Sequence, residues 1–114
     1  MSYDITVGDV DFNVTFNLSA LFYDHIPVER NRGGLHELDG LTGSAAASVL
    51  GQVFGRIDET RNRLWKLDAV GEPEFCAKYD APNGWGSAIG GIIFLAKLMA
   101  ACRENPRSKV RVSA

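Results

Sequence analysis

The chain has 114 residues, of which 46% are hydrophobic and 23% charged, and its formal net charge is −2. This composition is typical of one globular domain spanning residues 1–114, and it excludes disordered and fibrous proteins. A net charge this small offers no electrostatic footprint for duplex nucleic acid or an anionic membrane, so we expect neither as a partner.

The N-terminal residues MSYDITVGDV contain no basic segment followed by an apolar one, so no secretory signal is visible. The longest apolar run, residues 88–102, is interrupted by Lys97 and is too short to span a bilayer. We therefore expect a cytoplasmic protein, in which Cys76 and Cys102 are buried free thiols rather than a disulfide.

The residues from Tyr3 to Phe16 predict a β-hairpin. Two β-rich runs, YDITV and DFNVTF, flank Gly8 and Asp9, and a Gly-X pair between such runs is the signal of a type II′ turn. Apolar and polar residues alternate along the second run, so one face should be buried and the other polar.

A short helix over SALFYDHI follows, with Asn17 or Ser19 as its N-cap, and Pro27 should end it. Residues 27–43, PVERNRGGLHELDGLTG, predict an irregular loop with one helical turn at 35–38. Loops of this length in compact domains are usually either mobile or functional.

Thr42 is the expected N-cap of a long helix that runs to about Lys66. Gly51 and Gly55 within it each weaken the helix by roughly 1 kcal/mol and allow another backbone to approach. Glycines at this spacing indicate close packing against another element, in the same chain or in a second subunit.

Three more elements complete the chain. Pro73 begins a short helix that stops at Pro82, a last helix runs from near Ser87 to Asn105, and SKVRVS predicts a final strand. The order predicts an α+β fold in which the hairpin and the C-terminal strand form a small, mostly antiparallel sheet with three to four helices packed on it.

The segment NGWGSAIGG is the first candidate site. A helix N-terminus presents unpaired N–H groups, and glycines let a phosphate or carboxylate approach them. The predicted ligand-binding residues here are Asn83, Gly84, Trp85, Gly86 and Ser87. The glycine spacing fits neither the dinucleotide fingerprint nor a P-loop. The structural alternative is a turn in which Trp85 fills the core and Ser87 caps the helix.

Aromatic and basic residues elsewhere could complete such a site. Tyr23, with Trp65 and Trp85, could stack on a nucleotide ring, although core packing is the usual role of aromatic residues. Arg56, Arg61 and Arg63 could neutralise a phosphate, although surface charges paired with acidic neighbours explain them as well.

The segment DHIPVERNRGGLHELD carries residue types that bind metals or transfer protons. HELD, however, lacks the second histidine that a zinc-protease helix needs, and neither His25 nor His36 can be paired with a nucleophile. We therefore expect no metal, no cofactor and no enzymatic activity, and a small hydrolase is the weakest of the hypotheses.

Three segments together, NVTFN (13–17), NGWG (83–86) and NPRSKVRVS (105–113), resemble a group of small uncharacterised proteins encoded by actinobacterial phages, prophages and genomes. In that group the residue after Gly-Trp-Gly is often acidic, whereas here it is Ser87. The resemblance carries over no activity and no functional residue. It implies an accessory protein in the host cytoplasm that acts by binding, commonly as a homo-oligomer.

Two hypotheses follow. In the first, a non-enzymatic phage-type protein binds and sequesters a small phosphorylated or nucleotide-like ligand, such as a host defence signal. In the second, the loop at 27–43 binds and modulates a host protein.

Overall fold

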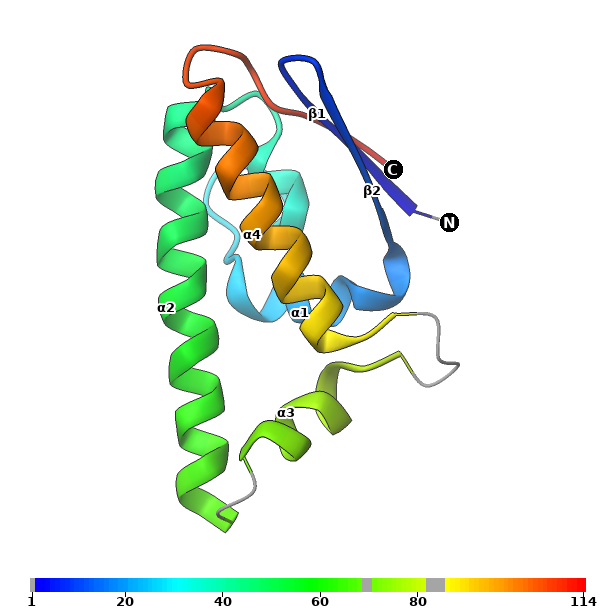
Figure 1. Ribbon diagram of the computed structural model, residues 1–114, viewed down its shortest axis with the longest axis vertical. Helices are drawn as coiled ribbons and strands as arrows, with labels where there is room; N and C mark the ends of the chain where they lie inside the picture. The colour runs from blue at the N-terminus through cyan, green and yellow to red at the C-terminus, as the bar shows by residue number, and fades with distance from the viewer. Residues whose placement is uncertain (1, 69–70, 82–85) are drawn as a thin grey trace.

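The computed structural model describes the backbone of residues 2–68, 71–81 and 86–114, and their side chains except those of 63–68 and 71–74. The described residues form an α+β fold, as expected (Figure 1). A three-stranded antiparallel sheet has the strand order β2-β1-β3. The helices α1, α2 and α4 lie on the side of its apolar face, and α3 lies farther from the sheet, against α2 and α4.

The predicted hairpin is confirmed. β1 (Ser2–Val7) pairs antiparallel with β2 (Val10–Thr15), and Val7 faces Val10 next to the two-residue turn. Gly8 in this turn has a φ of 58°, the positive value that hairpin turns of the primed types require at this position. Tyr3, Ile5 and Val7 point into the core, while Asp4 faces solvent.

The C-terminal strand pairs within its own chain. β3 (Arg111–Ser113) lies antiparallel to the other edge of β1, with Val112 opposite Ile5. The strand is shorter than the predicted SKVRVS, and Lys109 forms only an isolated bridge with Thr42. β1 is therefore the central strand, with its hairpin partner β2 on one side and the C-terminal strand β3 on the other.

The entry to the first helix differs from the prediction. A 3₁₀ turn, η1 (Phe16–Leu18), precedes α1 (Ser19–His25). Thr15 caps η1, because its Oγ1 accepts from the amide of Asn17 at 3.2 Å, whereas Leu18, the N-cap of α1, makes no side-chain cap bond. Ser19 is not a cap because its hydroxyl bonds to the Tyr3 hydroxyl at 2.8 Å instead. As expected, the helix ends before Pro27, with Ile26 in an extended conformation.

The long helix α2 (Gly43–Asp68) begins after Thr42, as predicted, and the Thr42 hydroxyl accepts from the amide of Ala45 at 3.3 Å. Its first turn lies against the end of α4 (Ala88–Glu104), where Ser44 N–H donates to the Pro106 carbonyl at 3.0 Å. The short helix α3 (Gly71–Tyr79) packs against the later turns of α2 (Figure 1).

The close neighbour predicted for Gly51 and Gly55 is absent from the part of the chain that the structure describes. A Cβ atom built at either glycine has no described atom within 4 Å. Gly43 is the position where two helices meet closely, because a Cβ there would collide with the carbonyl oxygens of Cys102 and Asn105. A second subunit at Gly51 and Gly55 stays a prediction.

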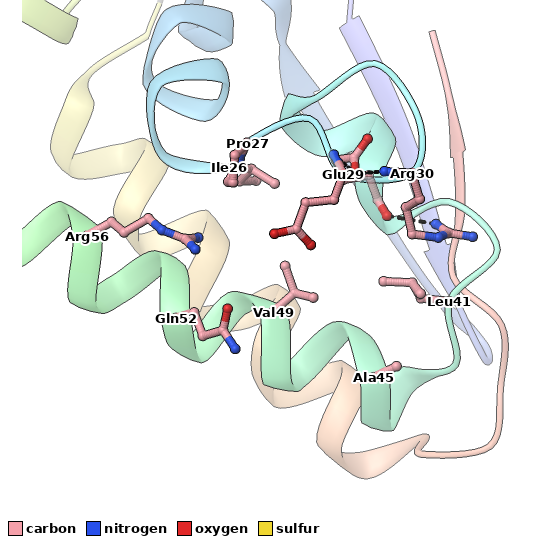
Figure 2. Close-up of a pocket in the computed structure, with 10 residues that line it drawn as sticks. Ile26, Pro27, Glu29, Arg30, Leu41, Ala45, Val49, Gln52 and Arg56 are labelled. Atoms are coloured by element: carbon pink, nitrogen blue, oxygen red, sulfur yellow. Dashed lines mark hydrogen bonds between the residues drawn. The ribbon is translucent and has the colours of Figure 1, made fainter.

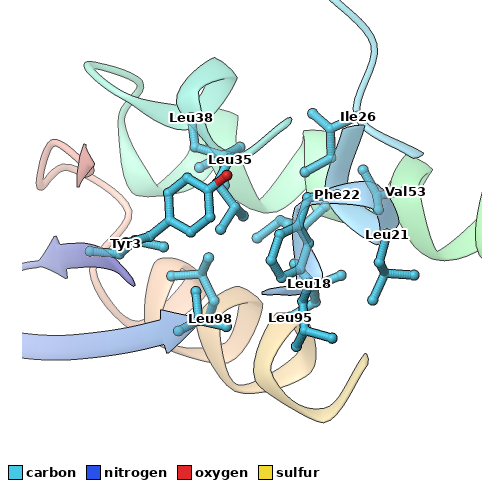
Figure 3. Close-up of a cluster of buried hydrophobic side chains, with 14 of the residues drawn as sticks. Tyr3, Leu18, Leu21, Phe22, Ile26, Leu35, Leu38, Val53, Leu95 and Leu98 are labelled. Atoms are coloured by element: carbon cyan, nitrogen blue, oxygen red, sulfur yellow. The ribbon is translucent and has the colours of Figure 1, made fainter. Parts of the chain in front are cut away.

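The core lies where α1, η2 (Gly34–Leu38), α2 and α4 meet the inner face of the sheet (Figure 3). Its labelled members are all nearly inaccessible to solvent: Tyr3, Leu18, Leu21, Phe22, Ile26, Leu35, Leu38, Val53, Leu95 and Leu98. η2 is the helical turn that the sequence predicted inside the long loop. Within the described part of the chain, no helix combines the length and apolarity needed to cross a membrane.

Candidate functional site

Part of the predicted glycine-tryptophan site lies outside the described residues: Asn83, Gly84 and Trp85, together with the side chain of Arg63. Of the remaining members, Ser87 is the N-cap of α4, and its hydroxyl accepts from the amide of Gly90 at 2.9 Å. Gly86 has a φ of 143° and lies against Thr15 and Leu18. These contacts agree with the alternative in which Gly86 and Ser87 form a turn and a helix cap rather than a ligand site.

The first turn of α4 already has an anionic partner from its own chain. The Asp80 carboxylate accepts from the amide of Ala88 at 2.7 Å, and the Ser87 carbonyl accepts from the amide of Gly91 at 2.9 Å. A negative ligand would therefore meet a carboxylate and amides that already have acceptors. The geometry of the described residues gives this helix end little capacity for an added anion.

The other predicted ligand residues contact different parts of the fold. Tyr23, which is 44% exposed, lies beside Gly33 and Gly34. The Arg61 guanidinium is 5.9 Å from the ring centre of Phe75 on α3. Arg56 reaches the carbonyl of His25, at 3.4 Å. No described contact joins these three side chains to Ser87.

The described side chains contain no cluster of three or more metal-binding residues. The hydroxyl that His25 contacts, on Thr60, is buried and also bonds to the Arg56 carbonyl. His25 is buried; its Nδ1 bonds to the Leu21 carbonyl at 2.8 Å and its Nε2 to the Thr60 hydroxyl at 3.0 Å. Burial lowers the pKa of His25, and that of His36 as well. His25 thus joins α1 to α2 as a structural residue.

Glu37 has a role that the sequence analysis missed. Its side chain is buried, with 4% exposure, and its carboxylate accepts four backbone N–H groups. One oxygen accepts from Glu29 at 2.9 Å and Arg30 at 2.8 Å, and the other from Asn31 at 2.7 Å and Gly33 at 3.0 Å. Burial alone would raise the pKa of Glu37, but these hydrogen bonds outweigh it and lower the pKa to about 2.

Two further side chains fix the loop at 27–43. The Arg30 guanidinium donates to the carbonyls of Glu37 and Asp39, both at 2.9 Å. The Asn31 side chain donates to the His36 carbonyl at 3.0 Å. The stretch predicted to be mobile or functional is thus bonded to η2 at many points, and it presents a defined surface.

A cavity of about 240 Å³ lies between this loop and the first half of α2 (Figure 2). Its apolar wall comes from Ile26, Pro27, Leu41, Ala45 and Val49, and its polar part from Glu29, Arg30, Glu37, Gln52 and Arg56. The lining holds no serine, threonine, cysteine or histidine, and one of its two carboxylates, Glu37, is occupied by four backbone N–H groups.

The elements explain why these side chains meet. Ala45, Val49, Gln52 and Arg56 follow one another at helical spacing, so they form one stripe on α2. Figure 2 shows this stripe facing Ile26 and Pro27, with the Glu29 carboxylate and the Arg56 guanidinium both turned toward the space between them. Among the predicted ligand residues whose side chains the structure describes, Arg56 lines this cavity. Tyr23, Arg61, Gly86 and Ser87 do not. Two sequence features point here: the loop at 27–43, predicted to be mobile or functional, and this stripe, whose Gln52 and Arg56 resemble an ordinary solvated helix face.

Comparison with known proteins gave no relative: no family model, no curated protein and no solved structure matches this chain.

Proposed function

We propose that this protein is an interaction module that binds another protein by accepting an apolar side chain of the partner into the cavity between residues 26–30 and α2. The observation that carries the proposal is the cavity itself, whose apolar wall lies beneath a loop held rigid by Glu37. Preformed apolar pockets that take a side chain of the partner are typical of the energetic centres of protein interfaces.

The size of the cavity favours a side chain over a nucleotide. Pockets for small molecules and cofactors usually measure about 300–1,000 Å³. The volume here, about 240 Å³, is below that range and suits one large apolar side chain. Glu29, Arg30 and Arg56 at its edge are exposed or half-buried, as expected for the rim of an interface, whereas Glu37 is buried.

The loop also presents apolar surface of its own. Val28 is 67% exposed and lies against Gly33, next to Tyr23. Because the Glu37 carboxylate fixes the backbone of residues 29–33, this surface loses little conformational entropy on binding. A host protein is the partner class that the sequence resemblance predicts.

The test places a photo-crosslinking amino acid at Gln52, on the cavity rim, in protein expressed in cells. We expect a specific partner to be crosslinked from Gln52 and not from Ser48, an exposed residue on α2 that does not line the cavity. The substitution Ala45→Phe, which fills the cavity, should abolish the crosslink, and Ser48→Phe should leave it unchanged. Equal crosslinking from both positions, or a crosslink that survives Ala45→Phe, would overturn the proposal.

Native mass spectrometry separates this proposal from ligand capture. A stoichiometric small phosphorylated molecule released from the purified protein would support sequestration of a ligand instead.

Deleting residues 30–34 is a poor test of the interaction, because the deletion removes three of the four N–H donors to the Glu37 carboxylate.

A further inference from the structure

Four charged residues line the cavity, and two of them, Arg30 and Glu37, are bonded to backbone groups of the loop. The other two, Glu29 and Arg56, come from different elements. The Glu29 carboxylate reaches it from the loop and the Arg56 guanidinium from α2 (Figure 2). No described hydrogen bond joins the Glu29 carboxylate to Arg30 or to Arg56. Arg30, next to Glu29 in the chain, donates to the carbonyls of Glu37 and Asp39, and Arg56 makes one long bond to the carbonyl of His25, at 3.4 Å.

A bound apolar side chain would lie between these two groups. Opposite charges on the partner would then be attracted to Glu29 and to Arg56, and like charges would be repelled. Exposed ion pairs contribute little to affinity, but they determine which partner binds and in which orientation. The lining therefore selects both an apolar side chain of the partner and the charges on either side of it.

We propose that the partner segment carries its apolar anchor between a basic residue that faces Glu29 and an acidic residue that faces Arg56. This inference rests on the proposed function, because it names the chemistry of the partner for the same cavity. Gln52, exposed on the rim between Val49 and Arg56, adds an amide for the backbone or a polar side chain of that segment.

The experiment is a selection from a displayed peptide library with the full-length protein. The baits are the wild type, Glu29→Lys and Arg56→Glu, with Asp58→Lys and Lys97→Glu as matched charge reversals at exposed positions outside the cavity. Circular dichroism and thermal unfolding confirm that each bait is folded. The wild type should enrich peptides with one large apolar residue flanked by a basic residue and an acidic one.

Each charge reversal in the protein should reverse the charge preferred on one side of the apolar residue in the selected peptides. Glu29→Lys should replace the basic preference by an acidic one and keep the other flank, and Arg56→Glu should do the opposite. In titrations of single peptides, each matched charge should improve the Kd about two- to five-fold. Asp58→Lys and Lys97→Glu should select the same peptides as the wild type.

Different failures have different meanings. Peptides that share an apolar anchor, lose binding to Ala45→Phe and carry the same flanking charges for every bait would overturn the charge assignment and leave the proposed function standing. No enrichment by any bait, or enriched peptides that still bind Ala45→Phe, would count against both. A free energy of unfolding that falls on either single reversal and is restored in Glu29→Lys/Arg56→Glu would show that the two residues pair with each other, which also overturns the inference.

Discussion

The Glu37 carboxylate takes the place of regular secondary structure for the residues before it. Backbone N–H groups that leave water need acceptors, and in residues 29–33 four of them find one in a single side chain. A buried carboxylate without partners would be costly, so the loop and the charge stabilise each other. The part of the cavity wall that this loop forms therefore depends on the hydrogen bonds to the Glu37 carboxylate.

The substitution Glu37→Gln tests this dependence. The amide nitrogen of glutamine would replace one carboxylate oxygen and face two N–H donors, so the free energy of unfolding should fall by about 2–4 kcal/mol. Urea denaturation measures the change. Glu29→Gln, at an exposed neighbour whose side chain is not part of this network, should change it by less than about 0.5 kcal/mol. Equal stability of the two variants would contradict the structural role of Glu37.

The same carboxylate predicts a loss of stability in acid. Its pKa is lowered from 4.5 to about 2, so folding favours the ionised form. The stabilisation is fully present above pH 4.5 and is lost as the pH falls from 4.5 to about 2. It amounts to about 3 kcal/mol. Urea unfolding at several pH values should show this loss in the wild type, and a Glu37→Gln variant with the same pH dependence would refute the assignment.

At the scale of elements, the glycines of α2 have opposite effects on stability at the start and in the middle of the helix. Gly43 lies where the helix meets the carbonyls at the end of α4, whereas Gly51 and Gly55 have open space where a Cβ would stand. The first glycine permits a close crossing of two helices. The other two weaken the helix, and no close contact with another described residue offsets this loss.

Alanine substitutions should therefore differ in sign. Gly51→Ala and Gly55→Ala should each raise the free energy of unfolding by about 0.5–1 kcal/mol, because alanine is the better helix former. Gly43→Ala should lower it, because its methyl group would meet backbone that cannot move freely. Thermal unfolding and sedimentation of each variant provide the measurement. Weaker self-association of Gly51→Ala would instead indicate a subunit contact at that face.

At the scale of the molecule, the two ends of the chain meet in one sheet. β1 lies between β2 and β3, so the C-terminal strand covers the edge that β1 would otherwise expose. Val112 connects this strand to the loop at 27–43, because its N–H donates to the Asp39 carboxylate at 2.9 Å. The sheet and the loop are therefore parts of one structural unit.

Removing residues 111–114 should destabilise the whole domain. The truncation unpairs one side of β1 and leaves the Asp39 carboxylate without the Val112 N–H. We expect a loss of about 2 kcal/mol or more in the free energy of unfolding. Deletion of Ala114 alone, an exposed residue beyond the strand, is the control and should have almost no effect. A truncated protein that unfolds at the urea concentration of the wild type would contradict this prediction.

The sequence alone determined the elements whose signals are local. Alternating residues and the Gly8 turn predicted the hairpin, Pro27 predicted the end of α1, and Thr42 predicted the start of α2. Together with the C-terminal strand, these signals were enough for the α+β fold. Each depends on interactions within a few residues, which is why it can be read without the rest of the chain.

Only the tertiary structure decided where the candidate site lies. The cavity brings Pro27 and Glu29 of the loop to Val49 and Arg56 of α2, residues whose contact depends on the path of the chain between them. Glu37 gave no signal either, because a carboxylate in a polar loop resembles any solvated acid until its four N–H donors are placed around it. Periodicity and turn chemistry act over one or two turns of chain, whereas a cavity is made by side chains that the fold alone brings together.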